Sequence, residues 1–409
     1  MRGRWRQTIA VAGLLAMLAP ACGQPQDQVV PHLSLRLTDS TSGFGLKLLD
    51  HLLAEPGAGN VLISPLSATL ALSMAASAAD GETRAAILQV LGLDPTLDPS
   101  SEARQVIDRL ALSDANVQLE LADAVWAQKG LTLSPAYVAK LRTDYKAQLA
   151  SLDFHSPDAP ATVNRWVEAA THHTISNLVD SFDPATVAYL VNATYFHALW
   201  SAEFKPDAGA DFHTFSGATQ KASMMKRDES VTELHTDDYI AELLPYKGGR
   251  FSAVILLPRK ALSPSAFSTF LRGGTWERAL ESLHGATGTS LGGPCKRPES
   301  SPVICDGTLV MPKFKLDYEK DLTKTLGAMG MPIPGAGLPE ICAACYLSTV
   351  VQKTHLEVDE KGTTASAATG VAVATALRLP TVVDRPFALA LIDNATDAPL
   401  FLGVVGQLT

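Results

Sequence analysis

Apolar positions in the first part of the chain recur at helical spacing. Residues 44–53 carry apolar side chains three and four positions apart, which predicts an amphipathic helix. A second helix, rich in Ala, Leu and Met, is predicted over 65–79, because Ser64 suits an N-cap and Pro65 suits a first helical turn. A shorter helix over 83–92 ends on a glycine.

Strand patterns dominate later in the chain. These runs are rich in β-branched and aromatic residues, or alternate between apolar and polar or large and small side chains. They are 188–200, 251–258, 309–316, 355–359 and 387–392. Helices and strands do not alternate as βαβ units, so the predicted fold class is α+β. The Gly-, Ser- and Pro-rich residues 285–301 are expected to form a surface loop.

Composition narrows the function classes. The chain has 409 residues, of which 46% are hydrophobic and 18% charged, enough for a large core and a soluble surface. The formal net charge is −9 with no basic stripe, which argues against nucleic-acid binding. The sequence contains neither a nucleophile elbow nor a phosphate-binding loop, so no motif indicates an enzyme. His172 and His173 are adjacent, so on a helix they would point apart, and we expect a solvated face rather than a metal site.

The N-terminus has the form of a targeting segment. Three arginines precede an apolar stretch over 8–19 that is too short to span a bilayer comfortably. Cys22 then resembles the lipidated cysteine of a bacterial lipoprotein, although Ala19 stands where that pattern has a large aliphatic residue. We expect a signal peptide over 1–21, a tether over 22–35 and one domain over 36–409. The expected location is outside the cytoplasm: outer membrane-anchored, periplasmic or extracellular. Simple secretion without lipidation is the alternative.

Four further cysteines would reside in an oxidising compartment. An even number suits two disulfides. Cys342 and Cys345 form a Cys-x-x-Cys pair, which alone could also indicate redox chemistry or half a zinc site. Cys295 and Cys305 lie ten positions apart, which does not match a zinc knuckle. No metal and no cofactor are predicted.

The segment from Glu360 to Arg378 is the most unusual in the chain. It has no charge between Lys361 and Arg378, and nearly all its side chains are small. Read as an extended strand, one face presents Thr363, Ala365, Ala367, Thr369, Val371 and Val373. Both faces are compact enough to enter a sheet. A flexible small-residue surface loop is the alternative that composition leaves open.

This segment resembles the hinge of the serpin family. Residues 360–369 follow that family's pattern of Glu, Gly, Thr, a run of small residues and Thr. Several other blocks resemble the family in the same order along the chain. They are 60–67, the Asn-x-Trp-Val at 164–167, 191–200 with Phe204, 224–226, 384–387 and 399–403.

The resemblance implies a fold and a mechanism. The fold would have three β-sheets, about eight to nine helices and an exposed reactive loop. A target serine protease, or as an alternative a cysteine protease, would attack one loop bond. The freed loop would then enter the central sheet as a new strand, as serpin loops do. The hinge residues would be Glu360, Gly362, Thr363, Ala365, Ala367 and Thr369. None of them is a proline, and no charge interrupts Thr363, Ala365 or Ala367, which favours insertion.

The family's usual loop length places the reactive bond between Ala376 and Leu377. An Ala before the bond implies an elastase-like or subtilisin-like target, whereas Arg378 would imply a trypsin-like one; Thr375 is a further alternative. The inhibitor is expected to be a monomer that meets a membrane only through a lipid anchor. A serpin without inhibition, acting as a binding or chaperone-like protein, is the competing function.

The resemblance also assigns structural roles. A polar cluster that lets the sheet open would comprise Ser64, Ser67, Asn192 and Gln352, the last standing where the family usually has His. Trp200 would pack beneath the point where the loop enters the sheet. The strands that follow Cys305 and Cys345 would be antiparallel neighbours with distant starts. The implied disulfides are therefore Cys295–Cys305 and Cys342–Cys345.

Overall fold

The computed structural model describes residues 36–111, 116–229, 231–287, 291, 295, 302–305, 307–363 and 379–408. Across this part of the chain, nine α-helices and a short π-helical turn, Leu271–Thr275, accompany the sheets. The helices are α1 (Arg36–Leu53), α2 (Pro65–Ala78), α3 (Gly81–Val90), α4 (Pro99–Leu110), α5 (Pro135–Thr143), α6 (Ala159–Ala170), α7 (Pro264–Phe270), α8 (Trp276–Thr287) and α9 (Thr323–Ala328).

Three larger sheets and two small ribbons make up the β-structure of the described residues. The largest has the order β1 (Val61–Ile63), β21 (Ala398–Val405), β20 (Phe387–Asp393), β11 (Phe251–Pro258), β10 (Tyr239–Pro245), β9 (Thr232–His235) and β12 (Val303–Ile304). The ribbons pair β15 (Ala336–Gly337) with β16 (Tyr346–Leu347), and β6 (Ala210–His213) with β7 (Thr219–Ala222).

The six-stranded sheet is the one that positions the site. Its order is β14 (Phe314–Asp321), β17 (Val351–Val358), β18 (Gly362–Thr363), β4 (Ala188–Leu199), β2 (Val117–Gln128) and β3 (Gln148–Leu152). The four-stranded sheet has the order β19 (Thr381–Val382), β13 (Leu309–Pro312), β8 (Met224–Arg227) and β5 (Lys205–Pro206). The α+β class is therefore confirmed, with the three expected sheets accompanied by two ribbons.

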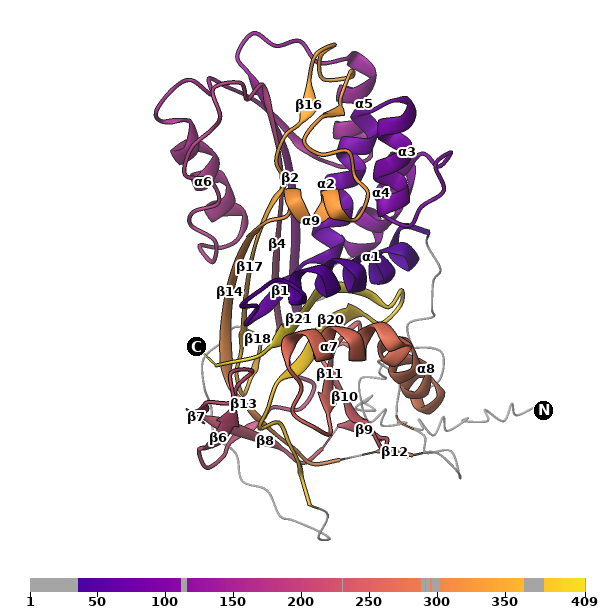
Figure 1. Cartoon of the computed structure of the whole chain (residues 1–409), viewed down its shortest axis with the longest axis vertical. Helices are drawn as coiled ribbons and strands as arrows, with labels where there is room; N and C mark the ends of the chain where they lie inside the picture. The colour runs from indigo at the N-terminus through magenta and orange to yellow at the C-terminus, as the bar shows by residue number, and fades with distance from the viewer. Residues whose placement is uncertain are drawn as a thin grey trace, which may run out of the picture.

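Helices cover both faces of the six-stranded sheet. Figure 1 shows α6 on one side of β2 and β4, and α1 and α2 on the other. Beneath α6, a small core contains Trp126, Val163 and Val191. On the opposite side, α2 lies in the main core and is buried at every position except Ala71, so it has no polar face. The predicted N-cap is present: the Ser64 hydroxyl accepts a hydrogen bond from the Ser67 N–H.

Three local expectations differ from the structure. The predicted strand over 309–316 divides at Lys313 into β13 and β14, which belong to different sheets. Residues 285–287 extend α8 instead of beginning a loop. His172 and His173 follow the end of α6 with positive φ angles of 48° and 64°, so they form a turn and not a helix face. Their imidazoles contact two separate carboxylates, on Glu120 and Glu168.

Candidate functional site

The hinge begins in a tight turn that leads into β18. The Asp359 carboxylate accepts hydrogen bonds from the N–H groups of Lys361, at 2.9 Å, and Gly362, at 3.1 Å. Strand β18 then pairs with β4 on one side and β17 on the other. A Cβ on Gly362 would lie 2.0 Å from the Ala198 carbonyl oxygen, so only glycine allows this close approach.

Two stacked aromatic residues support the inserted hinge. The rings of Trp200 and Tyr246 are parallel within 10°, with centroids 4.3 Å apart. The Trp200 indole N–H donates to the Asp359 carbonyl at 2.9 Å, and its backbone N–H donates to the Lys361 carbonyl at 2.8 Å. The Tyr246 hydroxyl is 2.8 Å from that of Thr363, which is 1% exposed. Thr363 therefore faces the main core, with Trp200 packed directly beneath the turn that precedes it.

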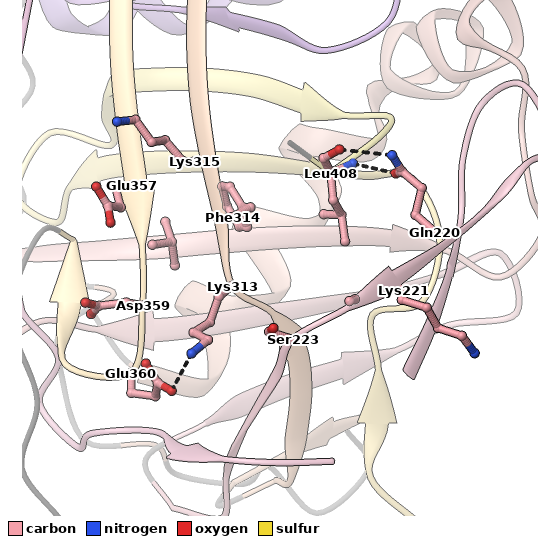
Figure 2. Close-up of a pocket in the computed structure, with 12 residues that line it drawn as sticks. Gln220, Lys221, Ser223, Lys313, Phe314, Lys315, Glu357, Asp359, Glu360 and Leu408 are labelled. Atoms are coloured by element: carbon pink, nitrogen blue, oxygen red, sulfur yellow. Dashed lines mark hydrogen bonds and ion pairs between the residues drawn. The ribbon is translucent and has the colours of Figure 1, made fainter. Parts of the chain in front are cut away.

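An ion pair fixes the base of the hinge to the neighbouring strand. Lys313 Nζ lies 3.0 Å from Glu360 Oε1, and the backbone carbonyl of Glu360 accepts from the Phe204 N–H at 2.7 Å. Figure 2 shows this pair at the edge of a cavity of about 530 Å³. The walls carry both signs of charge, including Lys315 and Glu357 on adjacent strands. This arrangement holds the hinge in place but leaves it accessible from one side.

Beyond β18, a gap separates β17 from β4. In the described ranges, no backbone pairing joins these two strands; both pair with β18 instead. A cavity of about 660 Å³ opens at the far end of the gap. Its walls come from the start of β4, the start of β17, α2 and the segment around Cys342. The sheet therefore already contains two hinge residues. A strand that continued from them would lie between β17 and β4, which do not pair with each other in the described ranges.

Polar side chains gather at the far end of this gap, around the 660 Å³ cavity. Gln352 bonds to both backbone groups of Ser64: its Oε1 accepts from the N–H at 3.0 Å, and its Nε2 donates to the carbonyl at 2.9 Å. The Ser64 hydroxyl also donates to the Leu400 carbonyl at 2.6 Å. Ser67 and Asn192 line the same cavity. Three of the four residues predicted as a polar cluster, Ser67, Asn192 and Gln352, thus line one cavity, and Ser64 is joined to them through Gln352, although Asn192 bonds elsewhere.

Asn192 bonds to a buried carboxyl group on the next strand. Its Nδ2 donates to Asp123 Oδ1 at 2.6 Å, and the two residues are direct partners in the β2–β4 pairing. Asp123 is only 5% exposed, and this burial raises the pKa of its carboxyl from 3.8 to about 7, against a smaller lowering by Asn192. A titratable group therefore lies beside the cavity at the centre of the sheet.

Both implied disulfides are present. Cys295–Cys305 and Cys342–Cys345 join Cα atoms that are 5.7 Å and 5.0 Å apart. The second bond lies in the wall of the 660 Å³ cavity. Four of the five cysteines are therefore bonded, and Cys22 lies outside the described residues.

Several predicted residues also lie outside the described part of the chain. They are the hinge residues Ala365, Ala367 and Thr369 and the reactive-bond candidates Thr375, Ala376, Leu377 and Arg378. Conversely, sequence reasoning missed Lys313, Tyr246 and Asp123. No local pattern identifies them, because their partners are 47, 117 and 69 positions away along the chain.

Comparison with known proteins agrees with this geometry. The family model described as "Serpin (serine protease inhibitor)" matches residues 39–408. Iripin-3 of Ixodes ricinus is 31% identical over 91% of this chain and 95% of its own length. Leukocyte elastase inhibitor A of Mus musculus is 30% identical over 90% and 99%.

Solved structures show the same fold. The native state of the thermophilic serpin tengpin superposes with a TM-score of 0.77, at 26% identity, covering 92% of this chain and 95% of tengpin. Thyroxine-binding globulin in complex with thyroxine superposes with a TM-score of 0.78 at 23% identity, covering 91% of this chain and 99% of that chain, which supports the fold alone. The family match and the relatives cover nearly the whole domain, and the chain belongs to the serpin family of serine protease inhibitors.

Proposed function

We propose that this protein inhibits a serine protease irreversibly, by inserting its cleaved reactive segment into the six-stranded sheet. The observation that carries the proposal is β18: Gly362 and Thr363 already lie between β17 and β4. The segment that follows, 364–378, contains no proline and no charge before Arg378. It can therefore extend β18 without losing ladder hydrogen bonds at proline or burying an unpaired charge.

The register of β18 predicts where each inserted residue would lie. Gly362 pairs with Leu199 and Thr363 with Ala198, so continued antiparallel pairing places residue 369 opposite Asn192 and residue 373 opposite Ala188. On the other side, Val358 pairs with Thr363, which places residue 369 opposite Gln352. Residues of the odd-numbered face would then point into the core as Thr363 does. These residues are Ala365, Ala367, Thr369, Val371 and Val373, which are small or apolar apart from the Thr369 hydroxyl.

This register gives a physical route to inhibition. The protease serine attacks the carbonyl carbon of the reactive bond and forms an ester, and the C-terminal fragment leaves with the released amine. Insertion then adds main-chain hydrogen bonds on both sides of the new strand and fills the gap between β17 and β4. The attached protease is carried toward the 660 Å³ cavity end of the sheet. Distortion of its active site would stop hydrolysis of the ester, because catalysis requires positioning within about 1 Å.

We assign the reactive bond to Ala376–Leu377. Pairing through residue 373 reaches Ala188, the first residue of β4, which leaves three residues to connect the strand to the ester. A small side chain before the bond fits a protease with a small specificity pocket, elastase-like or subtilisin-like. An elastase-like target is also consistent with the similarity to leukocyte elastase inhibitor A of Mus musculus.

Incubation with pancreatic elastase, subtilisin and trypsin tests the proposal. A protein–protease complex stable in SDS is the expected result, and mass spectrometry of the released fragment should show Leu377 as its first residue. Ala367→Arg should turn the inhibitor into a substrate, because the arginine would have to enter the core, whereas Ala367→Ser should still form the complex. Cleavage without any complex for all three proteases would instead favour the non-inhibitory, ligand-binding alternative.

We also propose that the inhibitor acts outside the cytoplasm, anchored through a lipid on Cys22. The signal-like sequence before Cys22 and the two disulfides support an oxidising compartment. No helix in the described part of the chain is long and apolar enough to cross a membrane. Metabolic labelling with a radioactive fatty acid should mark the wild type but not Cys22→Ser. Label retained by Cys22→Ser would exclude this anchor.

A further inference from the structure

Two buried glutamates face each other on strands β9 and β10, away from the hinge. Glu233 and Glu242 are direct cross-strand partners, and they are 4% and 0% exposed. Like charges in this position repel, and a carboxylate taken out of water without a partner is costly. Burial and the neighbouring Glu233 raise the pKa of Glu242 well above its usual value. The main charged influence on Glu242 is therefore another carboxylate and not a cation.

Three of the four carboxylate oxygens accept no hydrogen bond of normal geometry. They are both oxygens of Glu242 and Oε1 of Glu233. A contact with the Thr381 side chain lowers the pKa of Glu242, but this is the smallest of the three influences on that carboxyl. Most buried side-chain oxygens in proteins have at least one hydrogen-bond partner, so three without one in a single cluster are unusual. The orphaned oxygens therefore point to a ligand that the polypeptide itself does not supply.

His235 completes the group. It lies two positions after Glu233 on the same face of β9, and its Nε2 is 2.9 Å from Glu233 Oε2. One ligand atom from each of Glu233, His235 and Glu242 lies within 4.8 Å of the other two. His235 is partly exposed, so it provides access from solvent to the two buried carboxylates.

Gly307 lies directly against the Glu233 carboxyl group. A Cβ on Gly307 would lie 2.1 Å from the Glu233 carboxyl carbon, so no larger residue fits there. The Gly307 N–H donates to the Val231 carbonyl at 2.9 Å, which holds this glycine against β9. Backbone therefore covers the Glu233 carboxyl group on this side, which accounts for its burial.

We propose that Glu233, His235 and Glu242 form a binding site for one divalent cation, with Zn²⁺ as the ligand that fits best. One imidazole and two carboxylates are donors that zinc accepts at about 2.0–2.2 Å in tetrahedral geometry, with water as the fourth ligand. Mg²⁺ and Ca²⁺ prefer six or more oxygen ligands, which this group does not offer. The cation would neutralise the facing carboxylates. It would also join β9 and β10 next to Thr381, which begins β19 shortly after the reactive segment.

Titration of metal-stripped protein with ZnCl₂ alone tests the site. All proteins should carry Cys22→Ser, because Cys22 is the only cysteine outside the two disulfides. We expect binding of one equivalent and a saturable rise in melting temperature, since a ligand of the native state stabilises it. Co²⁺ should bind in place of zinc and give the visible absorption bands of a four-coordinate site. CaCl₂ and MgCl₂ should have no comparable effect.

Two variants and one matched control make the outcome decisive. Glu242→Gln and His235→Asn should each weaken zinc binding by about 100-fold or more. Mutation of residues that only hydrogen-bond to metal ligands already lowers metal affinity by about 10–100-fold. His172→Asn removes a histidine that has a carboxylate partner 2.8 Å away but, among the described residues, no third ligand, and it should leave binding unchanged. Absence of a one-equivalent event, or binding retained in both variants, would overturn the proposal. If zinc has no effect while Glu242→Gln alone raises the melting temperature, the glutamates share a proton instead.

Discussion

Gln352 satisfies both backbone groups of Ser64, at 3.0 Å and 2.9 Å, and so joins β17 to the start of α2. Ser64 is the N-cap of that helix, and its hydroxyl bonds to Leu400 in the seven-stranded sheet. One side chain therefore connects the strand that must move during insertion to two elements of the main core. The same side chain would be opposite Thr369 in the inserted state.

Removing this contact should make the sheet easier to open. Gln352→Ala leaves the Ser64 N–H without a partner, whereas the Ser64 carbonyl still accepts from the Ala68 N–H. A buried orphan of this kind costs about 1–3 kcal/mol. We expect a lower denaturant midpoint and faster heat-induced loss of inhibitory activity. Gln352→His should recover part of the loss, because the donor and acceptor nitrogens of an imidazole point in different directions and one ring can replace only one of the two hydrogen bonds to Ser64.

Glu357→Ala is the control for this experiment. Glu357 lies on the same strand, on the face opposite to Gln352, and is only partly buried. Its replacement should change the free energy of unfolding by no more than about 0.5 kcal/mol, as is usual for surface positions. The denaturant midpoint should therefore stay close to that of the wild type. Equal effects of Gln352→Ala and Glu357→Ala would contradict a special role for the Ser64 contact.

Thr369 should matter only after insertion. The register of β18 places it between Asn192 and Gln352, with its hydroxyl on the inward face. Thr369→Val should therefore lower the melting temperature of the loop-cleaved protein, because a buried polar pair would lose a partner worth about 1 kcal/mol. The uncleaved protein should melt as the wild type does.

Thr364→Val provides the matched comparison, because it removes a hydroxyl from the other face of the same segment. If instead Thr364→Val lowers the melting temperature of the cleaved form and Thr369→Val does not, the register derived from β18 is wrong by one residue. A one-residue shift reverses which face points inward.

Local sequence patterns predicted many elements of the fold, and resemblance to the family predicted the hinge, of which residues 360–363 lie in the described part of the chain. Small residues at every second position identify a segment that can enter a sheet, and the Ser64-Pro65 pair marks the start of α2. Both signals are local, since they depend on residues that are neighbours along the chain.

Other features depend on long-range contacts and could not be predicted in this way. The division between β13 and β14 at Lys313 follows from packing against two different sheets, and the alternating pattern is continuous across it. Strand β20 also alternates in side-chain size, yet it is buried at every position because both its faces are covered. The glutamate pair on β9 and β10 becomes recognisable only once the strands are in register.

The Lys313–Glu360 ion pair should control how firmly the hinge is held. Both side chains are partly exposed, so the pair itself contributes no more than about 1 kcal/mol. Glu360→Lys would replace this attraction by repulsion at the base of β18, and we expect faster proteolysis near Gly362 and a lower melting temperature. The double variant Lys313→Glu, Glu360→Lys should restore most of both properties.

Glu203→Lys is the matched charge reversal for that test. It disrupts the Lys247–Glu203 pair, whose atoms are 4.0 Å apart and which does not contact the hinge. Proteolysis near Gly362 should be unchanged. If Glu203→Lys accelerates it as much as Glu360→Lys does, net charge and not the specific pair is responsible.

Asp123 should make stability depend on pH across the physiological range. Burial raises the pKa of its carboxyl from 3.8 to about 7, so the folded protein keeps this proton after the unfolded chain has lost it. The folded state is therefore favoured fully below pH 4, and this contribution is lost as the pH rises to about 7, beyond which it is constant. The difference between the two pKa values corresponds to about 4 kcal/mol as an upper limit.

Asp123→Asn removes this titration and keeps an oxygen that can accept from Asn192. The variant should be close to the wild type in denaturant midpoint at pH 4.5 and clearly more stable at pH 8. Comparing the two proteins cancels other buried acids, such as Asp393, whose pKa burial also raises. Asp153→Asn is the control, because hydrogen bonds from Gln128 and His155 lower the pKa of that exposed carboxyl, and its titration is complete before pH 4.5. A constant difference between Asp123→Asn and the wild type from pH 4.5 to 8 would show that Asp123 is already ionised in the folded sheet.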